Sequence, residues 1–115
     1  MDVMHKDIME SYNNYLLNIP NGCQQIVNHI RENKIQEALG MILDFSEGVN
    51  WLVDVNQILK FHGISKLLEV EKIHDFLEEI NNGLAIHDFL LVADLFEYEI
   101  MPFFEQVEIY EVPVN

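Results

Sequence analysis

Apolar residues recur every three or four positions along most of this chain, which is the period of an α-helix. Such residues in the first periodic stretch are Ile8, Tyr12, Tyr15, Leu16, Ile19, Cys23, Ile26, Val27 and Ile30. Pro20 lies inside this stretch, and a proline removes a backbone donor and clashes with the preceding turn. Because the apolar phase continues through Pro20, we expect one kinked helix, with Asp7 as its N-cap and Asn33 as a left-handed residue at its end.

Three further helices follow from the same pattern. The second covers residues 35–61 and stops at Gly63, since glycine tolerates a left-handed conformation. Its expected core stripe is Ile35, Leu39, Ile42, Phe45, Val49, Leu52, Val53 and Asn56. The third helix begins after Ser65 as N-cap and ends at Gly83. The fourth starts between residues 84 and 88 and ends near residue 101.

Four amphipathic helices with short connections predict an all-α fold, namely an antiparallel up-down-up-down four-helix bundle with a kinked first helix. Each helix can bury its apolar stripe only against the others, and short loops make successive helices antiparallel. The length of 115 residues suits a single domain over residues 1–115. Residues 107–115 include Pro113 and lack a helical period, so we expect an irregular C-terminal tail.

The second and fourth helices carry more apolar surface than one bundle core can bury. The additional stripes, which are the candidate protein-interaction residues, consist of Trp51, Val55, Ile58, Leu91, Leu95 and Tyr98. A helix that is apolar all round is usually covered on all sides. The cover could be the first helix or the tail of the same chain, a second copy in a homodimer, or a different protein. Tryptophan and tyrosine are common anchors of interfaces.

Charge narrows the classes of partner. The chain has 20 acidic and 6 basic residues and a formal net charge of −14, a field that repels the phosphates of nucleic acids. Residues 73–115 contain no Lys or Arg, so this part is either a solvated acidic face or a surface that steers a basic partner. The sequence contains no apolar run of about 18 residues, which argues against a membrane span, and no basic segment followed by an apolar one near its start. We therefore expect a cytoplasmic protein without nucleic-acid or membrane partners.

Candidate chemistry is sparse. Glu71 and His74 form a Glu-x-x-His pair on one helical face, whereas di-iron bundles use two such motifs. Cys23 is the single cysteine, which excludes an internal disulfide and a cysteine-based zinc site. No phosphate-binding loop or nucleophile elbow is present. We expect a non-catalytic, cofactor-free protein-binding bundle; the alternative is a small metal-binding or enzymatic bundle in which Glu71 and His74 meet carboxylates of the fourth helix.

Two resemblances add to this interpretation. Residues 30–39 (IRENKIQEAL) and 48–52 (GVNWL) resemble a small uncharacterised all-helical family of Gram-positive bacteria, and residues 93–102 (ADLFEYEIMP) are similar to its C-terminal signature. This resemblance covers most of the chain and implies no assigned chemistry. The helix–short turn–helix layout of residues 26–52 resembles, more distantly, the flagellin-specific export chaperones. That resemblance implies a small cytoplasmic four-helix protein that holds a partly folded client on apolar grooves.

Overall fold

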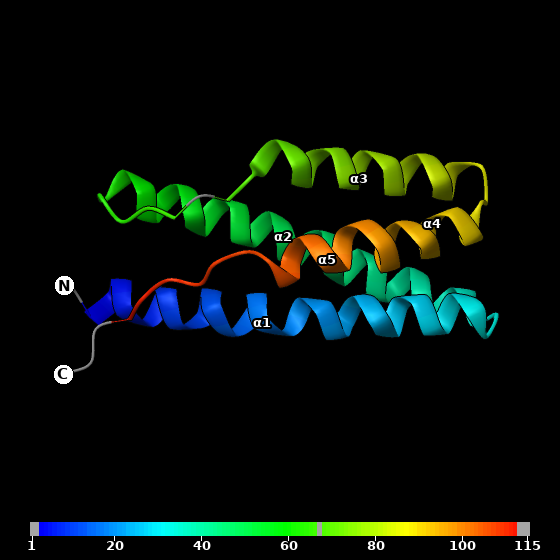
Figure 1. The fold of residues 1–115 in the computed structure, drawn as a ribbon, viewed down its shortest axis with the longest axis horizontal. Helices are drawn as coiled ribbons and strands as arrows, with labels where there is room; N and C mark the ends of the chain where they lie inside the picture. The colour runs from blue at the N-terminus through cyan, green and yellow to red at the C-terminus, as the bar shows by residue number, and fades with distance from the viewer. Residues whose placement is uncertain (1–2, 67, 113–115) are drawn as a thin grey trace.

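The computed structural model describes residues 3–66 and 68–112, and every regular element in this part is helical (Figure 1). The elements are α1 (Val3–Arg31), α2 (Ile35–Phe61), α3 (Val70–Ala85), α4 (Phe89–Leu95), the π-helical segment η1 (Phe96–Ile100) and α5 (Met101–Glu105). Because α4, η1 and α5 follow one another without a gap, they form one helical rod. Successive rods run in opposite directions (Figure 1), which confirms the predicted all-α up-down-up-down bundle.

The first periodic stretch is one helix, as predicted. α1 contains Pro20 in its interior, and Figure 1 shows no break in the helix. The N-cap prediction is wrong, because α1 already includes Val3 and so places Asp7 inside the helix. At the other end Asn33 has a φ of 61°, the left-handed conformation predicted for it, and the chain reverses there into α2.

The connection between α2 and α3 differs from the prediction. Gly63 has a φ of 81° just after α2, as expected for a helix stop. Ser65, however, is not an N-cap, because α3 begins only at Val70. The reason is a difference in length: α2 has 27 residues and α3 has 16, so the connecting chain must first return along part of α2 (Figure 1). Leu68 in this connection is buried, which ties the connection to the core.

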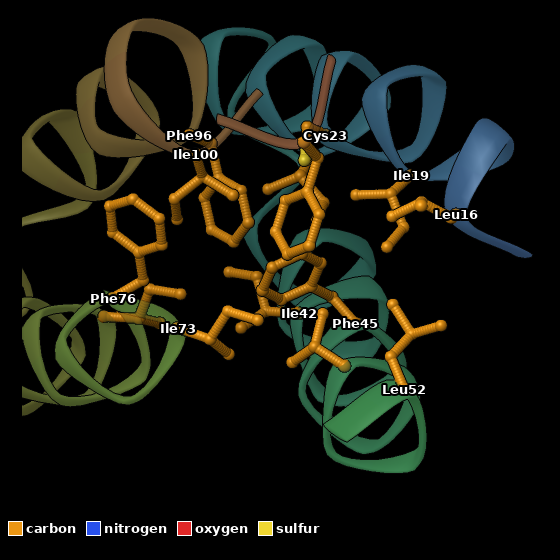
Figure 2. Packing of buried hydrophobic residues seen from close by; sticks show 14 of the residues in the cluster. Leu16, Ile19, Cys23, Ile42, Phe45, Leu52, Ile73, Phe76, Phe96 and Ile100 are labelled. Carbon is orange, nitrogen blue, oxygen red and sulfur yellow. The ribbon is translucent and has the colours of Figure 1, made fainter. Parts of the chain in front are cut away.

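The core lies where the four rods meet. α1 packs against α2 on one side and against the rod formed by α4, η1 and α5 on the other, while α3 packs against α4. Figure 2 shows Phe45 of α2 directed toward Phe96 of η1, and their rings meet edge to face at 5.1 Å. Phe104 of α5 adds a second edge-to-face contact with Phe45 at 6.1 Å. This aromatic cluster joins α2 to the last rod.

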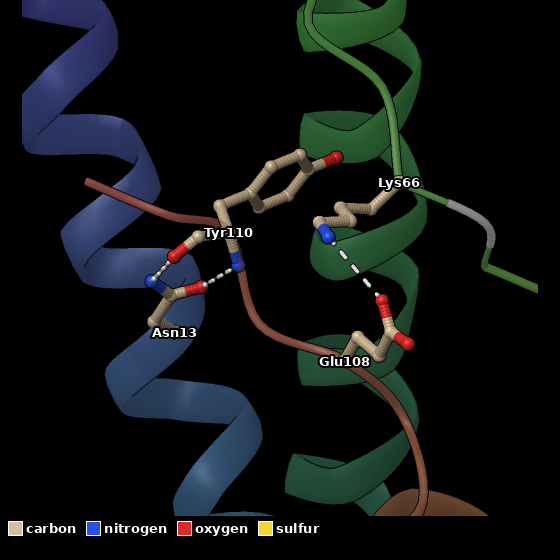
Figure 3. Close-up of polar contacts among 4 residues, drawn as sticks. All are labelled: Asn13, Lys66, Glu108 and Tyr110. Carbon is tan, nitrogen blue, oxygen red and sulfur yellow. Dashed lines mark hydrogen bonds and ion pairs between the residues drawn. The ribbon is translucent and has the colours of Figure 1, made fainter. Parts of the chain in front are cut away.

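The C-terminal tail is irregular through Val112, as predicted, and it is anchored in the core (Figure 3). The side-chain amide of Asn13 donates to the backbone carbonyl of Tyr110, and the Tyr110 N–H donates to Asn13 Oδ1, both at 2.8 Å. The Tyr110 hydroxyl donates to Asn56 Oδ1 at 2.7 Å. Lys66 Nζ also pairs with Glu108 at 3.2 Å. The tail therefore covers the core side of α1 and α2 where α3 does not reach; residues 113–115 lie outside the described part.

Candidate functional site

Two of the six candidate interaction residues belong to the core. Val55 is 6% exposed and Leu95 is 5% exposed, so neither side chain can contact a partner and their assignment to a binding surface is corrected. Val55 follows Trp51 by one turn, on the flank of α2 that faces Tyr15 of α1. Leu95 is covered because α4 is packed between α1 and α3.

The outer side of α2 keeps the largest set of exposed apolar residues on any one helix of the described chain. Trp51 is 39% exposed and Ile58 is 49% exposed, as the second-stripe interpretation expected. Sequence reasoning missed others: Leu39, expected in the core, is 40% exposed, while Leu43 and Phe61 are 59% and 85% exposed. The missed signal is their spacing, since positions 39, 43, 58 and 61 share one face at helical periodicity.

Leu91 and Tyr98 form a separate exposed pair on the last rod. Leu91 is 50% exposed on α4, and Tyr98 is 66% exposed on η1. Glu97 beside Tyr98 forms an ion pair with Arg31 at the end of α1, and this contact lowers the pKa of the Glu97 carboxyl. The structure therefore divides the predicted surface between α2 and the last rod rather than forming one patch.

Carboxylates accompany the apolar residues of α2. The acidic residues of this helix are Glu37, Asp44, Glu47 and Asp54, and all four are exposed, against the single basic residue Lys60. Among the described residues, the two ion pairs are Arg31–Glu97 and Lys66–Glu108, and neither involves α2. The outer side of α2 is thus apolar with unneutralised negative charge along it.

Tyr15 of α1 closes the groove between α1 and α2 because Gly48 lies opposite it. A Cβ at position 48 would overlap the Tyr15 Oη and Cζ atoms and lie 2.9 Å from Cε1, so only glycine admits the ring here. The ring also meets the Trp51 indole edge to face, with centroids 5.9 Å apart. Burial, followed by the nearby charge of Asp44, raises the pKa of Tyr15, which keeps its hydroxyl protonated at neutral pH.

A pocket of about 180 Å³ opens beside Tyr15 in this groove. Its lining consists of Tyr15, Asn18, Ile19, Gly22, Ile26, Met41, Asp44 and Phe45. Most of the lining is apolar, and Asp44 is the one charged residue of the set. Gly22 contributes open space, because a Cβ there would meet no atom within 4 Å. The pocket therefore combines apolar walls with one carboxylate and the polar groups of Tyr15 and Asn18.

The alternative metal site does not assemble from its proposed residues. Glu71 and His74 are both exposed on α3, and Glu99 of η1 instead lines a pocket with Asp75 and Glu79. Within residues 3–66 and 68–112, no group of three or more His, Cys, Asp or Glu residues is arranged to hold a metal ion. Glu97, another carboxylate of the last rod, is engaged by Arg31.

Cys23 lies in the core at 0% exposure. Burial is the main reason that the pKa of its thiol rises to about 12, so the thiolate needed for nucleophilic chemistry does not form at neutral pH. This agrees with the interpretation of Cys23 as an apolar core residue of the first helix. It offers no catalytic group to the groove.

Across the described residues, none of the helices combines the length and the apolar character that crossing a bilayer requires. Comparison with curated proteins finds no match, and comparison with solved structures finds none either. A family model does match, over residues 7–109, and it confirms the expectation of an uncharacterised family. The chain belongs to the family described as Domain of unknown function (DUF8042).

Proposed function

We propose that this protein is a non-catalytic binding protein that holds a basic amphipathic segment of another protein on the outer side of α2. One observation carries the proposal: large apolar side chains stay exposed along this helix among carboxylates that form no ion pair within the described part of the chain. Exposed apolar side chains rimmed by polar residues are a common feature of protein–protein interaction sites.

Trp51 is the expected anchor of this surface. A partly exposed tryptophan buries a large area on binding with few rotatable bonds, and tryptophan is enriched among residues that dominate binding energy. Trp51 is also held in place by Tyr15, so little conformational freedom is lost when a partner covers it. Ile58 lies two turns further along α2 and extends the contact.

The charge of the chain favours a basic partner over a second copy of itself. Two copies facing each other through α2 would bring eight carboxylates together, four from each chain, in proteins that each carry a net charge of −14. A partner helix with lysine or arginine beside an apolar stripe gains from the same field. A helix laid along α2 would present anchors at the i, i+3, i+4 and i+7 spacing that helix-in-groove recognition uses.

Three more detailed expectations from the sequence remain predictions and form part of this proposal. They are a cytoplasmic location, a Gram-positive bacterial host, and a chaperone-like role in which the bound segment is part of an incompletely folded client. The exposed face of α2 supports the last of these, because a chaperone needs apolar surface available before the client arrives.

Purification of the tagged chain from its native host tests the proposal. Trp51→Glu and Ile58→Glu should each lose one specific protein that wild type retains, and that protein should contain a basic amphipathic segment. Ile58→Glu leaves the Tyr15–Trp51 contact untouched, so it keeps the test valid if Trp51→Glu is unstable. Ile86→Glu is the matched control, since Ile86 is 71% exposed in the turn after α3.

The purified segment should then bind wild type directly, and more weakly at high salt. Two results would overturn the proposal. One is that both α2 variants keep every companion of wild type. The other is that light scattering finds a wild-type dimer that the α2 variants convert to monomer, because the occupant would then be a second copy.

A further inference from the structure

We propose that the pocket between α1 and α2 receives a lysine side chain, with its ammonium group at Asp44 and its aliphatic stem against Ile26 and Met41. This inference rests on the proposed function, since the lysine would belong to the bound basic segment. It goes beyond the proposed function by naming the type of residue that the pocket prefers and the place where that residue enters the groove between α1 and α2.

The size of the pocket suits one side chain. Small-molecule sites usually measure about 300–1,000 Å³. This pocket measures about 180 Å³, below that range. The free space above Gly22 gives a side chain room to enter between the helices, because no atom lies within 4 Å of the place where a Cβ would be. A single residue projecting from a partner helix can therefore fill the pocket without displacing either α1 or α2.

The chemistry of the walls selects a side chain that is apolar along its length and positive at its end. Ile19, Ile26, Met41 and Phe45 supply the apolar walls. Asp44 supplies the negative charge, and it forms no ion pair with any described residue. Lysine meets both demands, since it buries its four-carbon stem on apolar surface while its ammonium stays near water. A leucine would cover Asp44 without pairing it, and a glutamate would be repelled by it.

Three residues that line the pocket carry a side-chain oxygen able to accept a hydrogen bond from an ammonium group. They are Asp44, Tyr15 and Asn18. The amide nitrogen of Asn18 donates to the backbone carbonyl of Asn14 at 3.0 Å, so Oδ1 is the atom that Asn18 can offer to a ligand. The planar guanidinium of arginine favours a fork-shaped partner, whereas these acceptors come from three separate side chains.

n-Butylammonium, which has the four carbons and the ammonium group of a lysine side chain, is the probe that tests the inference. Binding is followed by NMR at the Gly22 and Gly48 amides and by Trp51 fluorescence, with 1-butanol and butyrate as uncharged and negative analogues. At low salt, n-butylammonium should bind about fivefold more tightly than 1-butanol, and butyrate should bind least. The preference for the ammonium over the alcohol should vanish in Asp44→Asn and persist in the control Asp54→Asn, which changes the net charge equally.

Filling the pocket provides a second, independent arm. Gly22→Leu should abolish binding of all the probes, and it should fold because the space above Gly22 is open and leucine favours a helix. Asn21→Leu is its control, since Asn21 is exposed next to Gly22 and does not line the pocket. The inference is overturned if 1-butanol binds as tightly as n-butylammonium, if Asp44→Asn keeps the preference, or if Gly22→Leu leaves binding unchanged.

The two proposals fail in different ways. If n-butylammonium shows no preference while Trp51→Glu and Ile58→Glu still lose a basic partner, the lysine pocket is wrong and the binding surface stands. If the α2 variants lose no partner, the proposed function falls, whatever the small probes do.

Discussion

Replacing Gly48 with alanine should destabilise the fold, although the same change at an exposed helix position normally stabilises it. Alanine is favoured over glycine inside a helix by about 1 kcal/mol. At position 48 the added methyl group would overlap the Tyr15 Oη and Cζ atoms, so the ring must leave its place against α2. Tyr15 would also lose its edge-to-face contact with Trp51.

The size of the effect follows from these terms. Overpacking typically costs about 1–3 kcal/mol, and an aromatic pair contributes about 0.5–1.5 kcal/mol. After subtraction of the propensity gain, Gly48→Ala should lower the free energy of unfolding by about 0.5–3.5 kcal/mol. Gly40→Ala is the matched control on the same helix: a Cβ there meets no atom within 4 Å. It should raise the free energy of unfolding by about 1 kcal/mol.

Urea unfolding followed by far-ultraviolet circular dichroism measures both variants, and Trp51 fluorescence reports whether the ring has moved. With a slope of about 1–3 kcal/mol per molar urea, the two midpoints should shift in opposite directions by readily measured amounts. In a Tyr15→Ala background the clash is absent, so Gly48→Ala should become stabilising there. If Gly48→Ala stabilises the wild-type chain as much as Gly40→Ala does, the packing described for Tyr15 is refuted.

Three further predictions follow from the core. Phe96→Ala and Ile42→Ala remove side chains that are 0% and 4% exposed, so each should lower the free energy of unfolding by about 2–5 kcal/mol. A thermal or urea unfolding midpoint that barely shifts in either variant would count against this core. Asn13→Ala removes the two hydrogen bonds to the Tyr110 backbone, so it should lower the free energy of unfolding by about 1–3 kcal/mol and speed hydrogen exchange at the Tyr110 amide. The control Asn14→Ala changes an exposed neighbour and should leave both quantities unchanged. Equal effects of the two variants would show that Asn13 does not anchor the tail. Burial raises the pKa of the Cys23 thiol from 9.0 to about 12. Between these pH values the unfolded chain holds fewer protons than the folded chain. The stability that the buried thiol contributes is therefore full below pH 9 and is lost as the pH rises toward 12. The free energy of unfolding should therefore fall more steeply with pH above 9 in wild type than in Cys23→Ala, and identical slopes would contradict the burial of the thiol.

The number of helices and their order could be predicted because helical periodicity is a local signal. The N-caps Asp7 and Ser65 could not, since the start of a helix depends on how far the neighbouring helices extend. Ser65 is a good N-cap by residue type, yet α3 starts at Val70 because the chain must first return along the longer α2. Asp7 fails for a related reason, as α1 extends beyond it toward the N-terminus.

The π-helical segment shows a second limit. At the ordinary helical spacing Phe103 would share a face with Phe96 and Ile100, whereas the structure buries Phe104 at 3% exposure and only partly buries Phe103. A π-helix reaches five residues back for its hydrogen bonds and so changes which residues share a face. A signal was present in the even spacing of four between Val92, Phe96, Ile100 and Phe104, which is longer than the ordinary helical repeat.

The candidate site was predictable in part. Trp51 and Ile58 could be identified because apolar residues stood on the side of the helix opposite the expected core. The pocket beside Tyr15 could not, because it arises only when α1 and α2 pack closely at Gly48 and leave space above Gly22. Neither glycine carries a sequence signal that separates this use from a turn.

A photo-cross-linking amino acid in place of Ile58 provides the most direct test that the outer side of α2 binds a basic segment. The matched control places it at Glu78, an exposed position on α3. We expect position 58 to cross-link to a basic amphipathic helix of another protein, with a yield that falls at high salt, and position 78 not to do so. Cross-links from position 58 that join two copies of this chain, or equal yields of the same product from both positions, would contradict it.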